Sequence, residues 1–416
     1  MAGAPSYDVV VAGGSIAGLL CAREIASAGH SVLVVEEDYE IGTPEHCGGL
    51  VSSAGLGQLG IVPFGDTLMH RIEKARITSP DGAHSVTIDA RRQGVLGISR
   101  RELDKQVAHQ AQRAGAVITT RTSLQEVTET GVRVTTGGGA GRDGGSLIDC
   151  RTVVDARGVS SLVQKNRTGV IPSAQYEVYA DWIEDGTVEV LPDRQRYPGF
   201  FAWVIPSGRG RGRVGVAGRG INVAEALEAF LAERGGSSGS GSSGGRHSTI
   251  RRIFAPIWIN GPIKRFYDGN VITVGDAAGQ AKPTTAGGIF SSGMGGMLAG
   301  QIISQYLDGA IPDMDAAGRS YQREWRGRFG REFGRQLLAR RILERADNAS
   351  ITDMIKSVPP GALQEISSGH DFDFHVSAIV RLLGVSGAAR TAQGMIGSEL
   401  RRVLLHRPNG KGRQHQ

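Results

Sequence analysis

Small residues that would let a backbone approach a phosphate gather near the N-terminus, at Gly13, Gly14, Ser15 and Gly18. An apolar run precedes them, a helical pattern follows, and Glu36 ends a second apolar run, Val32 to Val35. In such a strand–turn–helix–strand unit, the turn brings N–H groups at a helix N-terminus against a pyrophosphate. The carboxylate that ends the second strand can accept hydrogen bonds from a ribose diol. The pattern therefore predicts a dinucleotide site, with Ser15 at the middle glycine position of G-x-G-x-x-G.

A second carboxylate stands in a similar context near residue 276. The stretch Val271 to Ile289 reads VITVGDAAGQAKPTTAGGI, so an apolar strand ends at Gly275 and Asp276. Gly287 and Gly288 then open an uncharged helix. Asp276 could accept hydrogen bonds from a polyol, and the helix N-terminus could stabilise negative charge on a reduced isoalloxazine.

Two further side chains have either a chemical or a structural reading. Cys47 lies in the glycine-rich stretch Glu40 to Ser52, where a thiol packs as a small hydrophobe or acts as a redox or flavin-contacting group. Arg100 stands at the start of a helical pattern, where it clamps a phosphate or is solvated. The residues alone leave both pairs of alternatives open.

Aromatic side chains mark the strand-rich middle of the chain. Phe201 and Trp203 lie in the segment PGFFAWVIP, from Pro198 to Pro206. They share one face of a strand because the side-chain period is two. That face is either sheet core or the wall of an apolar cavity beside a cofactor.

Several motifs together resemble a known family. GGSIAG with Glu36, DARGVSS (155–161) and GDAAG (275–279) resemble the three FAD-binding signatures of p-hydroxybenzoate-hydroxylase-like flavoproteins. EIGTPEHCGG (40–49), PGFFAWVIP and GDAAGQAKPTTAGGI further resemble the geranylgeranyl reductase family, particularly the archaeal digeranylgeranylglycerophospholipid reductases. The resemblance covers about residues 5 to 345 and keeps the motifs in order.

The resemblance implies an α/β fold (α+β overall), namely a glutathione-reductase-like FAD-binding fold of the p-hydroxybenzoate-hydroxylase type. We expect a discontinuous FAD-binding domain at residues 1–65, 96–165 and 266–312. A strand-rich substrate domain is expected at 66–95 and 166–265, and a helical C-terminal region at 313–416. The Gly/Ser-rich segment 235–248 predicts a flexible surface loop.

The resemblance also implies roles for individual residues. It assigns FAD contacts to Gly13, Gly14, Ser15, Ala17, Gly18, Glu36, Cys47, Gly48, Gly49, Arg100, Leu124, Asp276, Gly288 and Ile289. It assigns catalytic roles to Cys47, Phe201 and Trp203. The family's aromatic box is Y-x-W-x-F-P, whereas this chain has Phe201, Trp203, Ile205 and Pro206. A tyrosine proton donor at that position therefore does not carry over. The loop also reads Cys-Gly-Gly-Leu, where many members have an extra acidic residue.

The implied reaction is FAD-dependent saturation of C=C bonds in geranylgeranyl chains of prenyl glycerophospholipids, as in archaeal-type membrane lipid biosynthesis. Alternatives are an FAD-dependent monooxygenase of the same fold, a flavoprotein dehydrogenase that passes electrons to quinone, and a non-catalytic flavin- or lipid-binding protein. Electrons must come from an external donor, but no second dinucleotide motif is found in the sequence to identify it. NAD(P)H, a ferredoxin or another carrier remain open. No metal site is expected.

Charge and composition concern location and partners. A formal charge of +6 predicts attraction to anionic surfaces, while no nucleic-acid module is present. Three cysteines and the absence of an N-terminal signal pattern favour a cytoplasmic protein. The basic residues and the implied phospholipid substrate further predict a peripheral position at the inner face of the cell membrane. The uncharged stretch Pro283 to Leu307 predicts a buried helix rather than a membrane span. Membrane docking is assigned to arginines on one helical face and basic residues near the C-terminus, at Arg319, Arg323, Arg326, Arg401, Arg402, Arg407, Lys411 and Arg413. The alternative is a solvated basic face.

Overall fold

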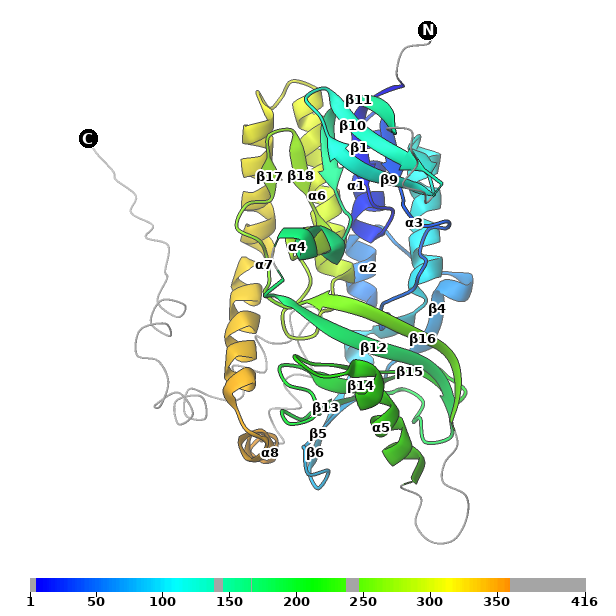
Figure 1. Cartoon of the computed structure of the whole chain (residues 1–416), viewed down its shortest axis with the longest axis vertical. Coiled ribbons are helices and arrows are strands. Elements are labelled where there is room, and N and C mark those ends of the chain that lie inside the picture. The colour runs from blue at the N-terminus through cyan, green and yellow to red at the C-terminus, as the bar shows by residue number, and fades with distance from the viewer. Residues whose placement is uncertain (1–4, 138–144, 166, 237–246, 360–416) are drawn as a thin grey trace, which may run out of the picture.

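A computed structural model describes residues 5–137, 145–165, 167–236 and 247–359. Two sheets form the body of the molecule, an eight-stranded sheet in the upper half of Figure 1 and a seven-stranded sheet below it. The predicted FAD-binding segments contain every strand of the first sheet. The predicted substrate segments contain every strand of the second.

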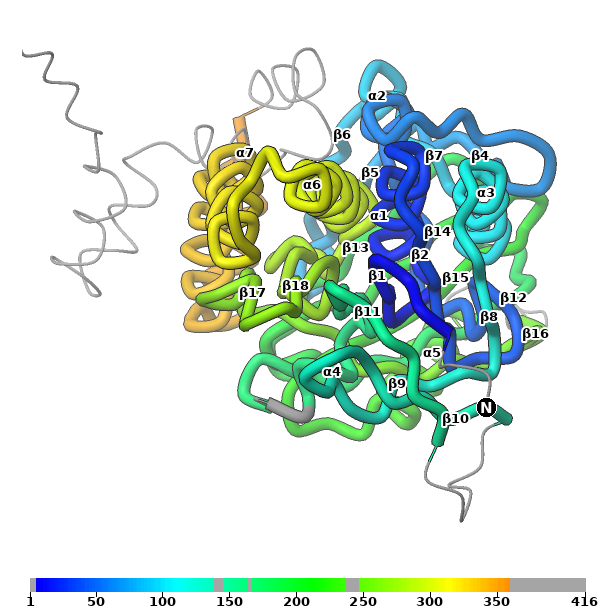
Figure 2. The backbone as a smooth tube through the Cα atoms, turned by 90° about the horizontal axis from the view of Figure 1, so that it is seen from above, coloured from blue at the N-terminus to red at the C-terminus, as the bar shows by residue number. Residues whose placement is uncertain are grey.

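The eight-stranded sheet is built around β1 (Ser6–Ala12), which pairs in parallel with β2 (Val32–Val35) and β11 (Ser146–Asp155). Strands β8 (Val117–Thr119) and β18 (Val271–Thr273) extend it in parallel on the two sides. The short β17 (Tyr267–Asp268) pairs antiparallel with β18, and β10 (Gly131–Thr136) joins β9 (Thr122–Val127) to β11. The Val-rich run of β1 is buried because helices cover one face and the β9–β10 ribbon lies on the other (Figure 2).

Three helices cover one face of this sheet: α1 (Ile16–Ser27), α3 (Arg100–Ala114) and α6 (Ile289–Leu307). Glycines let α6 approach α1 at backbone distance. A Cβ on Gly296 would overlap the carbonyl of Ala17, and a Cβ on Gly300 would lie 2.6 Å from the carbonyl oxygen of Cys21. The glycine-rich, uncharged stretch is thus a buried helix, as predicted. Within the described part of the chain, no helix combines the length and apolar content needed to cross a bilayer.

The seven-stranded sheet has the order β16-β12-β15-β14-β13-β5-β6. Its strands are β5 (Lys74–Thr78), β6 (Ser85–Asp89), β12 (Val170–Ala180), β13 (Thr187–Pro192), β14 (Phe201–Gly208), β15 (Arg211–Ala217) and β16 (His247–Trp258). Helix α5 (Val223–Gly236) packs on β12 and β15. The predicted loop 235–248 is wrong at both ends, because α5 runs through Gly236 and His247 already pairs with Ala180. Its centre lies outside the described residues.

A small three-stranded sheet links the two larger ones: β3 (Leu50–Ser52), β7 (Val95–Ile98) and β4 (Leu68–Arg71). Two short helices follow strands in the chain: α2 (Ser53–Gln58) comes directly after β3, and α4 (Val159–Lys165) comes after β11. Among the described residues, short 3-10 helices occur at Gly65–Thr67, Arg91–Gln93 and Gly275–Ala278.

The long helix α7 (Met314–Arg345) packs beside α6, and α8 (Asn348–Lys356) follows it. Tyr321, Trp325, Phe329 and Phe333 are buried and share one core with α1 and α6. These aromatic residues recur every four residues, so they form one packed face of the helix. Helix α7 is therefore continuous with the core of the eight-stranded sheet, whereas α8 packs against β5 and β6 of the seven-stranded sheet.

Candidate functional site

A cavity of about 430 Å³ lies where the motifs converge. It is bounded by the N-terminus of α1, the end of β2, the loop before β3, the start of α3, the end of β16 and the N-terminus of α6. Most of the predicted cofactor residues line it: Gly13, Gly14, Ser15, Ala17, Glu36, Cys47, Arg100, Leu124, Asp276, Gly288 and Ile289. Segments separated by more than two hundred residues in the sequence thus meet at one site.

The glycine turn is shaped for a close backbone approach. Gly13 has φ +111°, and an added Cβ there would overlap the carbonyl of Ala156. An added Cβ on Gly14 would lie 2.5 Å from Cδ1 of Ile41 and 3.1 Å from the Glu36 carboxylate. The Gly14 N–H donates to that carboxylate at 2.6 Å. Burial raises the pKa of Glu36, although the N–H groups of Asp38 and Gly14 partly offset the effect.

A second carboxylate faces the cavity from the opposite side. Asp276 accepts a hydrogen bond from the Ser292 hydroxyl at 3.1 Å, and a Cβ on Gly288 would lie 2.9 Å from the same oxygen. Burial raises the pKa of Asp276, while Ser292 and Arg100 act in the opposite direction. Such a carboxyl favours a hydroxyl-rich ligand that can donate to it.

Arg100 is a built-in cation of this cavity rather than a solvated residue. Its Nη2 atom donates to both carboxylate oxygens of Asp104, at 2.9 Å each. Its Nε atom is buried without a hydrogen-bond partner. A glycine cradle at a helix N-terminus, a diol acceptor, and an orphaned buried guanidinium nitrogen fit the pyrophosphate, ribose and ribityl groups of FAD.

Cys47 is the accessible thiol among the three free cysteines. Cys21 and Cys150 are buried, whereas Cys47 is half-buried and lines the cavity. Burial raises the pKa of Cys150 to about 11. The Cys47 sulfur accepts a hydrogen bond from the Gly49 N–H at 3.3 Å. Cys47 also packs against the main hydrophobic core, so its contact with the flavin stays a prediction.

Gly18, Gly48 and Gly49 do not line the cavity, and the structure gives them packing reasons instead. An added Cβ on Gly18 would overlap the Gly13 carbonyl. A Cβ on Gly48 would lie 2.7 Å from Ile205, and one on Gly49 would overlap Ile98 and Arg213. Their flavin contacts stay a prediction.

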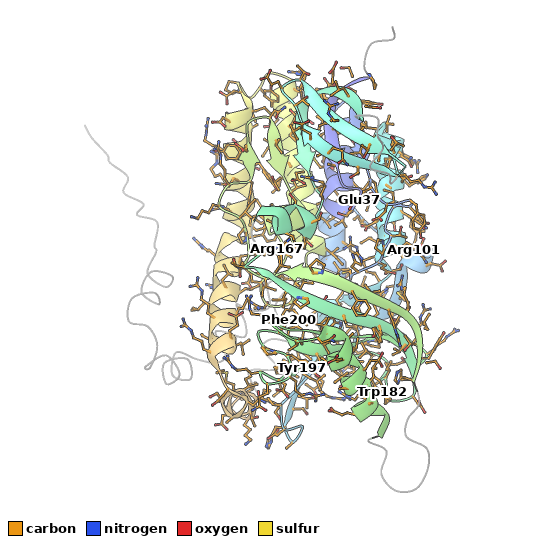
Figure 3. All side chains as sticks on the ribbon, in the orientation of Figure 1. Glu37, Arg101, Arg167, Trp182, Tyr197 and Phe200 are labelled. Carbon is orange, nitrogen blue, oxygen red and sulfur yellow. The ribbon has the colours of Figure 1, made fainter. Side chains whose placement is uncertain are left out.

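Phe201 and Trp203 do not line the cavity. They lie behind the loop of residues 45–49 (the Cys47 loop), to which Gln175 connects Trp203. As predicted, they share a face of β14, with ring centroids 6.1 Å apart, and Phe200 stacks on Phe201 at 4.1 Å. Figure 3 labels Phe200 below the long strands β12 and β16, and Glu37, from the cavity lining, above them. The Trp203 indole donates to Gln175 at 3.0 Å, and the Gln175 amide donates to the Cys47 carbonyl at 3.3 Å.

The sequence did not predict the buried polar residues of the substrate sheet. Gln175, Glu177 and Arg213 are each at most 4% exposed. Their signal is a polar side chain within an otherwise apolar strand, as in YEVYA and GRVGV. It also missed Ala255 to Trp258 of β16, which contribute to the cavity wall.

Known proteins share this arrangement along most of their length. The family model of lycopene cyclase protein matches residues 8–181. Digeranylgeranylglycerophospholipid reductase 2 of Methanothermobacter thermautotrophicus is 31% identical, over 87% of this chain and 94% of the relative. The chain belongs to the digeranylgeranylglycerophospholipid reductase family. The Methanopyrus kandleri protein of the same name is 28% identical over 88% of this chain and 93% of its own length.

Solved structures show the fold of this reductase family. A geranylgeranyl bacteriochlorophyll reductase-like protein from Thermoplasma acidophilum has a TM-score of 0.80 at 21% identity, covering 95% of this chain and all of that one. The p-nitrophenol 4-monooxygenase PnpA of Pseudomonas putida has a TM-score of 0.65 at 16% identity, covering 89% and 99%. The fold is the p-hydroxybenzoate-hydroxylase type, and the family's chemistry is that of an FAD-dependent reductase.

Proposed function

We propose that this chain uses FAD to saturate isolated C=C bonds in the geranylgeranyl chains of prenyl glycerophospholipids, as a step in membrane lipid biosynthesis. The observation that carries the proposal is its near full-length similarity to an archaeal reductase named for that substrate. The convergence of Gly14, Glu36 and Asp276 on one cavity supports the choice of cofactor.

An unactivated alkene has no carbonyl oxygen to polarise, so the protein contributes binding, orientation and exclusion of water. Bound FAD supplies the reducing equivalent as hydride. Gly14 would lie against the pyrophosphate of FAD, and Glu36 would bind the adenosine ribose. Arg100 and Asp276 would hold the diphosphate and ribityl region. The prenyl chain would lie next to the Cys47 loop, and Phe201 and Trp203, which lie behind that loop, would support it there.

Reduction also requires a proton at the second alkene carbon. Phe201 has no exchangeable proton where the family box has tyrosine. We assign this proton to the Cys47 thiol, since its side chain lines the cavity and its carbonyl is held by Gln175 next to the aromatic strand. Solvent returns the proton when product leaves.

The proposed partners are an external electron donor and an anionic membrane surface. NAD(P)H, a ferredoxin and another carrier all remain candidates for the donor.

The contacts of the α7 arginines bear on membrane docking. Arg319 pairs with Asp315 at 3.3 Å, and Arg326 donates to the carbonyls of Ile263 and Lys264 at 2.9 and 2.8 Å. The prediction that Arg326 binds lipid does not agree with these contacts, because its guanidinium is already engaged by the two carbonyls. Among the described residues, the docking proposal therefore rests on the exposed Arg319 and Arg323. The C-terminal basic residues lie outside the described residues.

The test is anaerobic incubation of prenyl glycerophospholipid with dithionite-reduced holoenzyme, followed by mass spectrometry. We expect a mass gain of H₂ for each saturated bond, with no oxygen incorporated. Dithionite makes the result independent of the physiological donor. An oxygen-dependent hydroxylated product would replace the proposal by a monooxygenase. Bound lipid with every double bond intact would replace it by a binding protein.

A further inference from the structure

Arg213 of β15 is a charged side chain that leaves its own sheet and enters the base of the Cys47 loop. It is 3% exposed. Its guanidinium donates to the carboxylate of Glu45 at 2.6 Å, to the carbonyl of Gly48 at 3.1 Å and to the carbonyl of Ile98 at 3.0 Å. These acceptors belong to the loop and to β7, so one side chain joins the substrate sheet to both.

Glu45 gathers further donors at the same point. Its carboxylate accepts from Arg251 of β16 at 3.0 Å and from the backbone N–H of Arg100 at 2.8 Å. Burial alone would raise the pKa of Glu45, but Arg213, Arg251 and the Arg100 N–H together hold it below its ordinary value. The carboxyl is therefore ionised at neutral pH and ties the loop to α3 and to two strands of the substrate sheet.

The backbone of the loop is adapted to this guanidinium. Gly49 has φ +74°, and a Cβ there would overlap Nη1 of Arg213. Arg213 of β15 holds the Gly48 carbonyl, and Gln175 of β12 holds the preceding carbonyl, that of Cys47, at 3.3 Å. Two consecutive carbonyls are thus fixed by two different strands of the sheet.

We propose that Glu45 and Arg213 are positioning residues that fix the backbone of residues 45–49 between the cavity and the aromatic strand, so that the Cys47 thiol keeps one place relative to Trp203. The inference rests on the proposed function only where it places Cys47 at the reacting bond. A purely structural ion pair would instead stabilise the whole sheet without a special effect on the loop.

The first test is hydrogen–deuterium exchange on FAD-loaded protein carrying Glu45→Gln or Arg213→Lys. Both variants keep a side chain of similar length that can form part of the hydrogen bonding. We expect the peptide that contains residues 45–49 to exchange about tenfold faster or more, while strands of both large sheets exchange as in the wild type. Arg234→Lys is the matched control, because Arg234 pairs with Glu189 of β13, away from the loop.

The second test uses the accessible thiol itself. We expect iodoacetamide to alkylate Cys47 at a changed rate in the two loop variants, with the buried Cys21 and Cys150 as internal references. Single-turnover prenyl reduction should fall in both while FAD stays bound, and Arg213→Lys should keep more rate than Arg213→Met. If Arg213→Met does not fold, the first two variants still decide.

Unchanged exchange at 45–49 together with unchanged Cys47 alkylation in both folded variants would overturn the inference. So would an increase of exchange spread evenly through the chain. Failure of the proposed function gives a different result, because wild-type protein would then leave prenyl lipid unreduced while exchange at the loop still responded to the variants.

Discussion

The backbone N–H of Gly14 and the carboxylate of Glu36 are joined by a 2.6 Å hydrogen bond, which connects the turn and the second strand of the dinucleotide motif. The other carboxylate oxygen accepts from the N–H of Asp38 at 2.9 Å. Two backbone donors therefore hold Glu36 in one orientation at the edge of the cavity.

Replacing Glu36 with alanine should weaken FAD binding about tenfold or more, since a hydrogen bond to a charged group contributes about 1.5 to 3 kcal/mol. Fluorescence titration of the apoprotein with FAD measures the change. Glu129→Ala removes an exposed carboxylate elsewhere in the same domain and should have no effect. Equal affinity in both variants would contradict the ribose assignment of Glu36.

Gly14→Val should prevent FAD binding more severely than Glu36→Ala. The added side chain would meet Ile41 and the Glu36 carboxylate, and it would occupy space that a pyrophosphate needs. Absorbance of the purified protein in the flavin bands is the measurement. The wild type should be yellow with non-covalent FAD. Gly327→Ala should be yellow as well, because Gly327 lies in α7, does not line the cavity and has open space for a Cβ.

Asp276→Asn should stabilise the apoprotein and weaken FAD retention. The pKa of Asp276 is raised in the folded state, so its ionised form is less stable there than in the unfolded chain. This cost is absent below the unfolded pKa, grows as the pH rises from the unfolded pKa to the folded pKa, and is constant above the folded pKa. At neutral pH, the substitution should therefore gain of the order of 1 kcal/mol in unfolding free energy, the size of relieving an unmatched buried group.

Thermal denaturation of apoprotein at several pH values measures this effect. The advantage of Asp276→Asn over wild type should shrink as the pH is lowered, because the wild-type carboxyl becomes protonated. A variant that is less stable at every pH would show that Asp276 is structural rather than a ligand-binding group.

The sequence predicted the cavity well because its groups follow from local patterns. A strand that runs into glycines and ends at Glu36 or Asp276 fixes backbone and carboxylate together, so the residues were found before the fold was known. Arg213 and Glu45 are 168 residues apart, and neither strand alternation nor a family motif says which carboxylate a buried guanidinium meets. The position of α7 does not follow from the sequence for the same reason: an aromatic residue every four positions indicates a packed helix face, but not that α6 is the element packed against it.

Docking to a membrane surface should depend on anionic lipid and on salt. Each basic residue near an anionic leaflet contributes about 1 kcal/mol, and the attraction is screened within about 8 to 10 Å. We expect the whole chain to co-sediment with anionic vesicles, to bind neutral vesicles weakly, and to be released by high salt. Arg319→Gln with Arg323→Gln should reduce binding, whereas Arg326→Gln, which loses carbonyl contacts, should instead lower stability. Equal binding to both vesicle types would contradict electrostatic docking.

Cys47 gives the sharpest separation of chemistry from stability. The side chain is half-buried, lines the cavity and packs against the main core, so Cys47→Ala should lower the unfolding free energy by about 1 kcal/mol. The same change removes the proton that we assign to the second alkene carbon, and single-turnover reduction should fall about 100-fold, within the range of general acid catalysis.

Cys47→Ser keeps a hydroxyl proton of much higher pKa, so its single-turnover rate should lie between those of Cys47→Ala and the wild type. The FAD absorbance should be unchanged in both variants. Cys150→Ala is the control for a buried thiol, and its effect should appear in stability rather than in rate. Full activity in Cys47→Ala would return this residue to a packing role and leave the assignment of the cofactor cavity intact.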